Sequence, residues 1–147
     1  MTGPTTISRT ELARHTRRTM ERVRRGETIV VASFGEEQVA LLDIHDYRLL
    51  RAVARYQARA TARPSSTPAG LDEAQVEAVR RHHGPQAAWD LVLHAYLRGD
   101  ISLGRAAALL GLDRFDLQAR FLRLGLPLRG GPQDPDEALE DARALEA

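Results

Sequence analysis

The residues of this chain best equipped for chemistry are its arginines, and they are unevenly distributed. All 21 basic residues are Arg, and none is Lys. Residues 1–63 hold 12 Arg and 7 acidic residues, a net charge of +5, whereas residues 64–147 hold 9 Arg and 13 acidic residues, a net charge of −4. Guanidinium groups pair with phosphates through charge-assisted hydrogen bonds. The charge asymmetry favours two modules with different partners.

Other chemistry has little support in the sequence. The absence of Cys removes disulfides and thiolate catalysis. The five histidines lack metal-ligand spacing, since the adjacent His82 and His83 point apart on a helix. Gly130 and Gly131 are not followed by the Lys and the Ser or Thr that complete a phosphate-binding loop. We therefore expect no enzyme, no metal site and no cofactor.

The sequence also shows no pattern typical of a membrane span or an export signal. No apolar run approaches the ~18 residues of a membrane span. The N-terminus has no apolar targeting segment. Together with the lack of Cys, this predicts a soluble, cytoplasmic protein with no membrane partner.

Many of the arginines in the first part lie on one predicted helix. Ser8 and Glu11 have the spacing of a capping box, and Gly26 supplies a stop, so we expect a helix over residues 9–25. One side of this helix is apolar or small and consists of Leu12, Thr16, Met20 and Val23. The opposite side carries a ridge of Arg14, Arg18, Arg22 and Arg25. This arrangement predicts a polyanion-binding surface.

A hairpin and a second helix complete this module. Two β-branched runs, Thr28 to Ser33 and Gln38 to Asp43, are expected to pair around a turn at residues 34–37. Asp46 can then cap a helix that runs toward Arg59. Residues 1–59 are therefore expected to form an α+β module of strand, helix, hairpin and helix. The arginines of the last helix (48, 51, 55 and 59) form a stripe that is either a solvated face or a second ridge facing an anion or a partner protein.

The second half of the chain is helical by pattern. Residues 60–71 are assigned to a linker, because residues 60–70 contain two prolines and no large apolar side chain. The remaining residues, 72–147, are expected to form an all-α module. Its helices are predicted near residues 72–83, 85–98, 103–110, 114–124 and 136–145. Within it, Ser102, Ala107, Gly111 and Leu117 have the spacing of a helix–turn–helix.

The features of the first module belong to a longer ordered pattern over roughly 55 residues. It comprises Thr6-Ile7-Ser8, Glu11-Leu12, Val23, Gly26-Glu27, Ile29-Val30-Val31, Gly35, Val39-Ala40-Leu41-Leu42 and Asp46-Tyr47. This pattern resembles the Phd/YefM family of antitoxins. The resemblance implies a homodimer that binds a palindromic operator and represses its own toxin–antitoxin operon. Ala13 stands where family members often carry an arginine.

On this basis we expect the DNA contacts to come from the start and the arginine-bearing face of the predicted helix. The residues concerned are Ser8, Arg9, Thr10, Arg14, Arg17, Arg18 and Arg22. The arginines would face phosphates, so binding is expected to depend strongly on salt.

A second ordered pattern covers about residues 87–145. It comprises Tyr96, Arg98-Gly99, Ile101-Ser102-Leu103-Gly104, Ala106-Ala107, Leu110-Gly111, Phe115 and Leu124-Gly125-Leu126-Pro127. This pattern looks like the UPF0175 family of small antitoxins. The resemblance implies a cognate toxin as partner, often a ribonuclease similar to PIN domains.

Helix 114–124 favours protein contact over DNA reading. Leu117, Phe121 and Leu124 form one apolar face, and Phe115, Ala119 and Leu122 form a second one nearly opposite. Residues 98–116 carry three Arg and three Asp, so they have no net attraction for phosphate. A helix that is apolar on two sides must be covered twice.

The C-terminal sequence suggests a further contact. Asp134, Pro135 and Glu137 fit the first positions of a last helix, and residues 132–147 hold six acids and one Arg. Its apolar seam consists of Leu139, Ala142 and Leu145. Either this seam enters a groove of a toxin, or the tail packs back on its own domain. We assign toxin binding to both apolar sets, Phe115, Ala119, Leu122, Leu139, Ala142 and Leu145.

These observations favour an antitoxin of a type II toxin–antitoxin system, which neutralises a toxin by direct binding and represses its operon. Two alternatives remain open. One is a stand-alone DNA-binding transcriptional regulator without a toxin, and the other is a protein adaptor without DNA binding. The neighbouring reading frame would distinguish the first alternative from the antitoxin.

Overall fold

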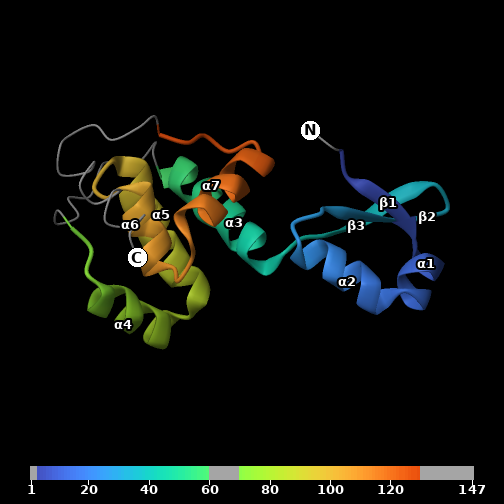
Figure 1. Cartoon of the computed structure of the whole chain (residues 1–147), viewed down its shortest axis with the longest axis horizontal. Helices are drawn as coiled ribbons and strands as arrows, with labels where there is room; N and C mark the ends of the chain where they lie inside the picture. The colour runs from blue at the N-terminus through green and yellow to red at the C-terminus, as the bar shows by residue number, and fades with distance from the viewer. Residues whose placement is uncertain (1–2, 60–69, 130–147) are drawn as a thin grey trace. The chain divides into compact units, whose positions relative to one another are not determined.

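The computed structural model describes residues 3–59 and 70–129 (Figure 1). Within these ranges the fold is α+β, with one three-stranded sheet and seven helices. The chain divides into two compact units, Met1–Tyr47 and Arg48–Ala147, hereafter the first and the second unit. None of the helices in the described ranges combines the length and apolar character needed to cross a membrane.

The sheet of the first unit has the order β1-β2-β3. Strand β1 (Thr5–Ser8) pairs in parallel with β2 (Ile29–Ser33), and β2 pairs in antiparallel fashion with β3 (Glu36–Leu41). Phe34 and Gly35, with φ of 54° and 79°, form a two-residue turn of the kind that follows strand twist. The expected turn at residues 34–37 was therefore too long, and β3 begins two residues earlier than predicted.

The predicted helix over residues 9–25 is broken in two. Helix α1 (Arg9–Arg14) and helix α2 (Thr16–Arg24) meet at His15, whose φ of −125° and ψ of 35° are not helical. The Thr16 hydroxyl donates to the Leu12 carbonyl at 2.7 Å. It thereby takes the acceptor that an unbroken helix offers to the Thr16 N–H.

The break also changes which side of α2 is buried. Val23 is buried as expected, but Thr16 is exposed and Met20 is 50% exposed, while Thr19 takes the inward position. Because His15 is not helical, the side chains of α2 point in directions that differ from those of a continuous helix. The predicted apolar side, which assumed one helix over residues 9–25, is therefore correct for Val23 but not for Thr16 and Met20. The small core consists of Ile7, Val23, Ile29 and Val31, with Leu12 and Leu41 packed against it.

The second unit contains the remaining helices. Their bounds are α3 (Ile44–Arg59), α4 (Glu73–His83), α5 (Pro85–Arg98), α6 (Leu103–Leu109) and α7 (Arg114–Arg123), with α3 beginning in the first unit. Side chains cap the starts of α4, α6 and α7, whereas α5 begins with Pro85 and has no side-chain cap. Asp72 and Gln75 form a complete capping box on α4, and the Ser102 side chain accepts the Arg105 N–H on α6. Helices α4 to α7 agree with the predicted ranges within one residue at each end.

The start of α3 differs from the prediction. The Asp43 carboxylate accepts the His45 N–H at 3.0 Å, so Asp43 occupies the capping position. Asp46, expected as the cap, lies inside the first turn and is 2% exposed. The reason is that the helix begins at Ile44, three residues before the position expected from the pattern.

Helix α3 packs largely into the second core. Leu49, Ala52 and Val53 are buried in one cluster with residues of the later helices, including Trp89 and Phe121. The compact boundary after Tyr47 therefore differs from the expected module of residues 1–59. Most of the predicted linker and the predicted helix 136–145 lie outside the described residues.

Candidate nucleic-acid and protein interfaces

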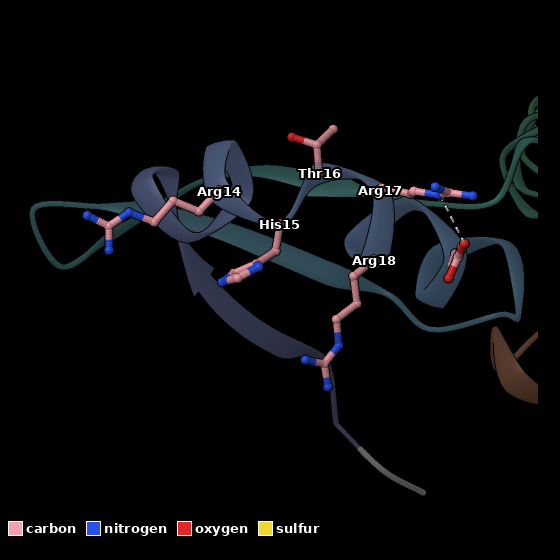
Figure 2. A pocket seen from close by; sticks show the side chains of 6 residues that line it. Arg14, His15, Thr16, Arg17 and Arg18 are labelled. Atoms are coloured by element: carbon pink, nitrogen blue, oxygen red, sulfur yellow. Dashed lines mark ion pairs between the residues drawn. The ribbon is translucent and has the colours of Figure 1, made fainter.

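The break between α1 and α2 gathers basic side chains on the surface of the first unit. An open pocket there is lined by Arg14, His15, Thr16, Arg17, Arg18 and Glu21. Figure 2 shows His15 and Arg18 pointing to one side of the helix pair and Thr16 to the opposite side. The four residues Arg14, His15, Arg17 and Arg18 are hereafter called the basic surface.

The start of helix α2 has features that favour a bound anion. Helix α2 has no side-chain cap and no acidic residue in its first turn. Arg17 and Arg18 lie in that turn, next to the positive end of the helix dipole. A phosphate bound here would offset both the arginine charges and the uncapped N–H groups. The arrangement is therefore suited to bind an anion.

The arginines of the basic surface are weakly engaged with the rest of the unit. Arg17 faces Glu21 at 3.7 Å, but the Arg17 side chain is 96% exposed, so this ion pair contributes little to folding. Arg14 and Arg18 are exposed as well. Their guanidinium groups lie at the surface, where a partner can reach them.

Arg22 has a different role from its neighbours. Its Nη2 atom lies 2.6 Å from the Glu27 carboxylate and 3.3 Å from the Thr5 hydroxyl. The hydrogen bond that Arg22 donates to the Glu27 carboxylate raises the pKa of Arg22. Arg22 therefore links α2 to β1 and to the segment before β2, and it is half-buried rather than presented on the surface.

The other predicted DNA-contacting residues lie at the start of α1. Ser8 caps this helix, because its hydroxyl accepts the Glu11 N–H at 3.1 Å, which is one half of the expected capping box. Arg9 and Thr10 are exposed beside it. Sequence reasoning missed His15 as a member of the basic surface. A His-Thr pair inside an otherwise regular helical pattern was the available signal, because threonine hydroxyls compete for helical acceptors.

Helix α7 in the second unit presents the predicted apolar face to the surface. Phe115 is 59% and Leu122 is 56% exposed, and Ala119 between them is exposed. On the opposite side Leu117 and Phe121 are completely buried. The other predicted toxin-contacting residues, Leu139, Ala142 and Leu145, lie outside the described residues.

The polar strip of α7 is less open than expected. Arg120 is only 9% exposed and its Nε atom lies 3.3 Å from the Asp116 carboxylate. Asp113 caps the helix by accepting the Phe115 N–H at 2.7 Å. The groups that a DNA-reading helix would offer at its start are thus partly used in folding.

Residues after α7 hold it against the core. The Leu126 N–H donates to the Phe121 carbonyl at 2.9 Å. The Arg129 guanidinium lies 4.7 Å from the centre of the Tyr96 ring and donates to the Ile101 carbonyl at 2.6 Å. These contacts fix the inner side of α7, and the face with Phe115 and Leu122 points outward.

No family model, curated protein or solved structure matches this chain. In the part of the chain that the structure describes, no group of three or more His, Cys, Asp or Glu side chains is arranged to hold a metal ion.

Proposed function

We propose that this protein is an antitoxin of a type II toxin–antitoxin system. The first unit binds operator DNA as a homodimer, and the second unit binds the cognate toxin, for which a ribonuclease similar to PIN domains is the proposed identity. Neutralisation is stoichiometric, since the toxin is covered rather than modified. The DNA function also represses the operon.

The observation that carries the proposal is the basic surface at the α1–α2 break. Its arginines form at most a weak ion pair within the unit, and two of them stand beside an uncapped helix start. This combination costs folding energy and is relieved by a bound phosphate. A DNA backbone supplies phosphates at regular spacing, and two copies of the surface in a dimer would engage two half-sites.

Exposed apolar side chains in the first unit support the dimer. Phe34 is 98% exposed, and Val39 and Met20 are 55% and 50% exposed. Strand β3 is an edge strand that is almost entirely exposed. Open edges and apolar side chains of this kind are commonly covered by another chain.

The exposed face of α7 supports protein contact by the second unit. Phe115 and Leu122 are seven residues apart and therefore lie on one side of the helix. Large aromatic and aliphatic side chains of this kind anchor protein interfaces. The helix pair α6–α7 is proposed to serve this contact instead of DNA reading.

A gel shift with the DNA upstream of the reading frame tests the DNA function. The double variant Arg14→Gln/Arg18→Gln is expected to lose most of its affinity and to lower the salt dependence by about one unit per lost contact. Arg24→Gln/Arg25→Gln is the matched control, because it removes the same charge from two exposed arginines outside the basic surface. Equal binding by the wild type and the double variant would contradict the proposal.

Co-purification with the product of the neighbouring gene tests the toxin function. The wild type is expected to retain that product, and Phe115→Asp/Leu122→Asp is expected to release it. If the gel shift succeeds and no neighbouring product binds, the stand-alone transcriptional regulator becomes the better description. Its support is the basic surface alone.

A further inference from the structure

His15 lies at the junction of α1 and α2, and its backbone is held from both sides. The His15 N–H donates to the Glu11 carbonyl of α1 at 3.0 Å, and the His15 carbonyl accepts the Thr19 N–H of α2 at 2.9 Å. Thr19 is only 4% exposed, so the second of these bonds joins His15 to the buried side of α2. The backbone alone therefore holds His15 in place.

The side chain of His15 takes no part in these contacts. The residue is exposed, and although it is the N-cap of α2, its side chain does not cap that helix. Within residues 3–59 and 70–129, no hydrogen bond or ion pair engages the ring. Its imidazole nitrogens are therefore available to a partner.

The charged groups around the ring come from both helices. Arg14 of α1 lines the same pocket as His15, and so do Arg17, Arg18 and Glu21 of α2. Figure 2 shows the His15 ring between the side chains of Arg14 and Arg18, whereas Arg17 extends away toward Glu21. A ligand that reaches Arg14 and Arg18 therefore also meets His15.

The acids of the two helices leave this place open to an anion. Each helix contains one acid. Glu21 of α2 lies 3.7 Å from Arg17, and Glu11 of α1 is not among the residues that line the pocket. The pocket thus has an excess of positive charge, which attracts a phosphate.

We propose that His15 binds a backbone phosphate of DNA as an imidazolium, and that its ring takes up a proton from the solvent on binding. The inference rests on the proposed DNA function and adds a pH dependence to the same site. A neutral imidazole donates a hydrogen bond from one nitrogen only, whereas an imidazolium donates from both. The charged ring adds a charge-assisted hydrogen bond to the phosphate contacts of Arg14 and Arg18.

Proton uptake by His15 makes DNA affinity depend on pH. A phosphate beside the ring stabilises its charged form, so the complex holds the proton to higher pH than the free protein does. The contribution of His15 is complete in acid and is lost as pH rises through the range around 6.5 in which histidines ordinarily titrate. The arginines stay charged throughout this range and supply the affinity that remains.

The test is fluorescence anisotropy of the full chain with a labelled duplex of the DNA upstream of the reading frame, from about pH 5.5 to about pH 8.5 at constant ionic strength. For the wild type, log affinity per bound surface is expected to fall by up to about one for each unit of pH in this range. His15→Gln is expected to remove this dependence. His15→Arg carries a permanent charge and is expected to bind at every pH as tightly as the wild type does in acid.

The salt dependence of the same binding supplies a second readout. In acid, the slope of log affinity against log salt is expected to be smaller in His15→Gln than in the wild type by about one per bound surface. This difference should close as pH rises. A purely structural role of His15 would instead change the affinity equally at all pH values.

The matched control is His82→Gln, which removes an exposed histidine from α4 in the second unit and is expected to keep the pH dependence of the wild type. A pH dependence that survives in His15→Gln, or that is lost equally in the control, would overturn the inference. A wild-type affinity that does not change with pH would overturn it as well.

The result separates this inference from the proposed function. If Arg14→Gln/Arg18→Gln weakens binding and His15→Gln keeps the pH dependence, the inference fails and the proposed function stands. If Arg14→Gln/Arg18→Gln leaves binding unchanged, both fail. Circular dichroism of each variant verifies that helix content is unchanged.

Discussion

The two units use the same residue type in different ways. In the first unit the arginines of the basic surface are exposed and take little part in folding, with a single weak ion pair between Arg17 and Glu21. In the second unit several guanidinium groups complete the fold by donating to backbone carbonyls. Examples are Arg80 to Leu109, Arg105 to Leu71 and Arg129 to Ile101.

This difference shows that arginine content alone does not identify a binding surface. A guanidinium has five donors, so it can satisfy carbonyls at helix ends that would otherwise be buried without partners. Only arginines whose guanidinium groups do not form such hydrogen bonds within the fold are available to a partner. Counting charges along the sequence finds both kinds and cannot separate them.

The largest effect on stability is expected at Arg129. Arg129→Ala removes the contact over the Tyr96 ring and the hydrogen bond to the Ile101 carbonyl, which should lower the free energy of unfolding by about 2 kcal/mol. Urea denaturation of the full chain measures it. Affinity for DNA, determined on the folded variant, should not change. A loss below the precision of the measurement would show that this arginine is no more structural than those of the first unit.

Arg22 is the exception within the first unit and should give a smaller loss of stability. Arg22→Ala breaks the contacts to Glu27 and Thr5 that link α2 to its neighbours. Because the pair is partly exposed, solvent and salt screen it, and the loss should shrink at high salt. Thermal unfolding at low and high salt measures this dependence. If Arg22→Ala and Arg24→Ala had the same melting temperature, Arg22 would not have the structural role that distinguishes it from the other arginines of the first unit.

The arginines of the second unit should also affect a neighbouring histidine. Burial lowers the pKa of His94, and the charges of Arg98 and Arg59 lower it further, against the opposing charge of Asp100. As pH falls below the ordinary value of 6.5, the unfolded chain takes up this proton first, so stability should fall with pH in that range and stay level above it. His94→Gln should weaken this dependence, which denaturation over a pH series would detect. An identical pH profile in the variant would refute the assignment.

The smallest effect is expected at Arg17. Its ion pair with Glu21 is long and the Arg17 side chain is almost fully exposed, so Arg17→Ala should leave the unfolding transition unchanged. Its DNA affinity should nevertheless fall, together with the salt dependence of binding. Parallel denaturation and gel-shift measurements check both parts. A clear destabilisation would place Arg17 with the structural arginines and weaken the comparison.

The sequence was most informative where local signals act alone. The helix starts at Asp72, Ser102 and Asp113 depend on a side chain and a backbone N–H two or three residues later, so a short pattern suffices to locate them. The two-sided apolar pattern of α7 was also visible, because helical periodicity determines which side chains share a face. The exposed Phe115 and Leu122 follow directly from it.

The missed features depend on competition or on tertiary contacts. The break at His15 coincides with a hydrogen bond from the Thr16 hydroxyl to the Leu12 carbonyl, a local interaction that periodicity does not reveal. The placement of α3 in the second core depends on packing with helices that come much later in the chain. The hydrogen bond from the Gln86 side chain to the Arg48 carbonyl joins α5 to α3, and no local pattern contains it.

The burial of Leu49, Ala52 and Val53 has a consequence for how the protein comes apart. A protease cut between residues 60 and 69 would break the chain without separating the two units, because α3 remains packed in the second core. The nicked protein would then behave as a non-covalent complex of two fragments, single in a native gel and double under denaturing conditions. Release of the N-terminal fragment would require α3 to leave the second core, and that step would expose apolar side chains that Leu49, Ala52 and Val53 now cover.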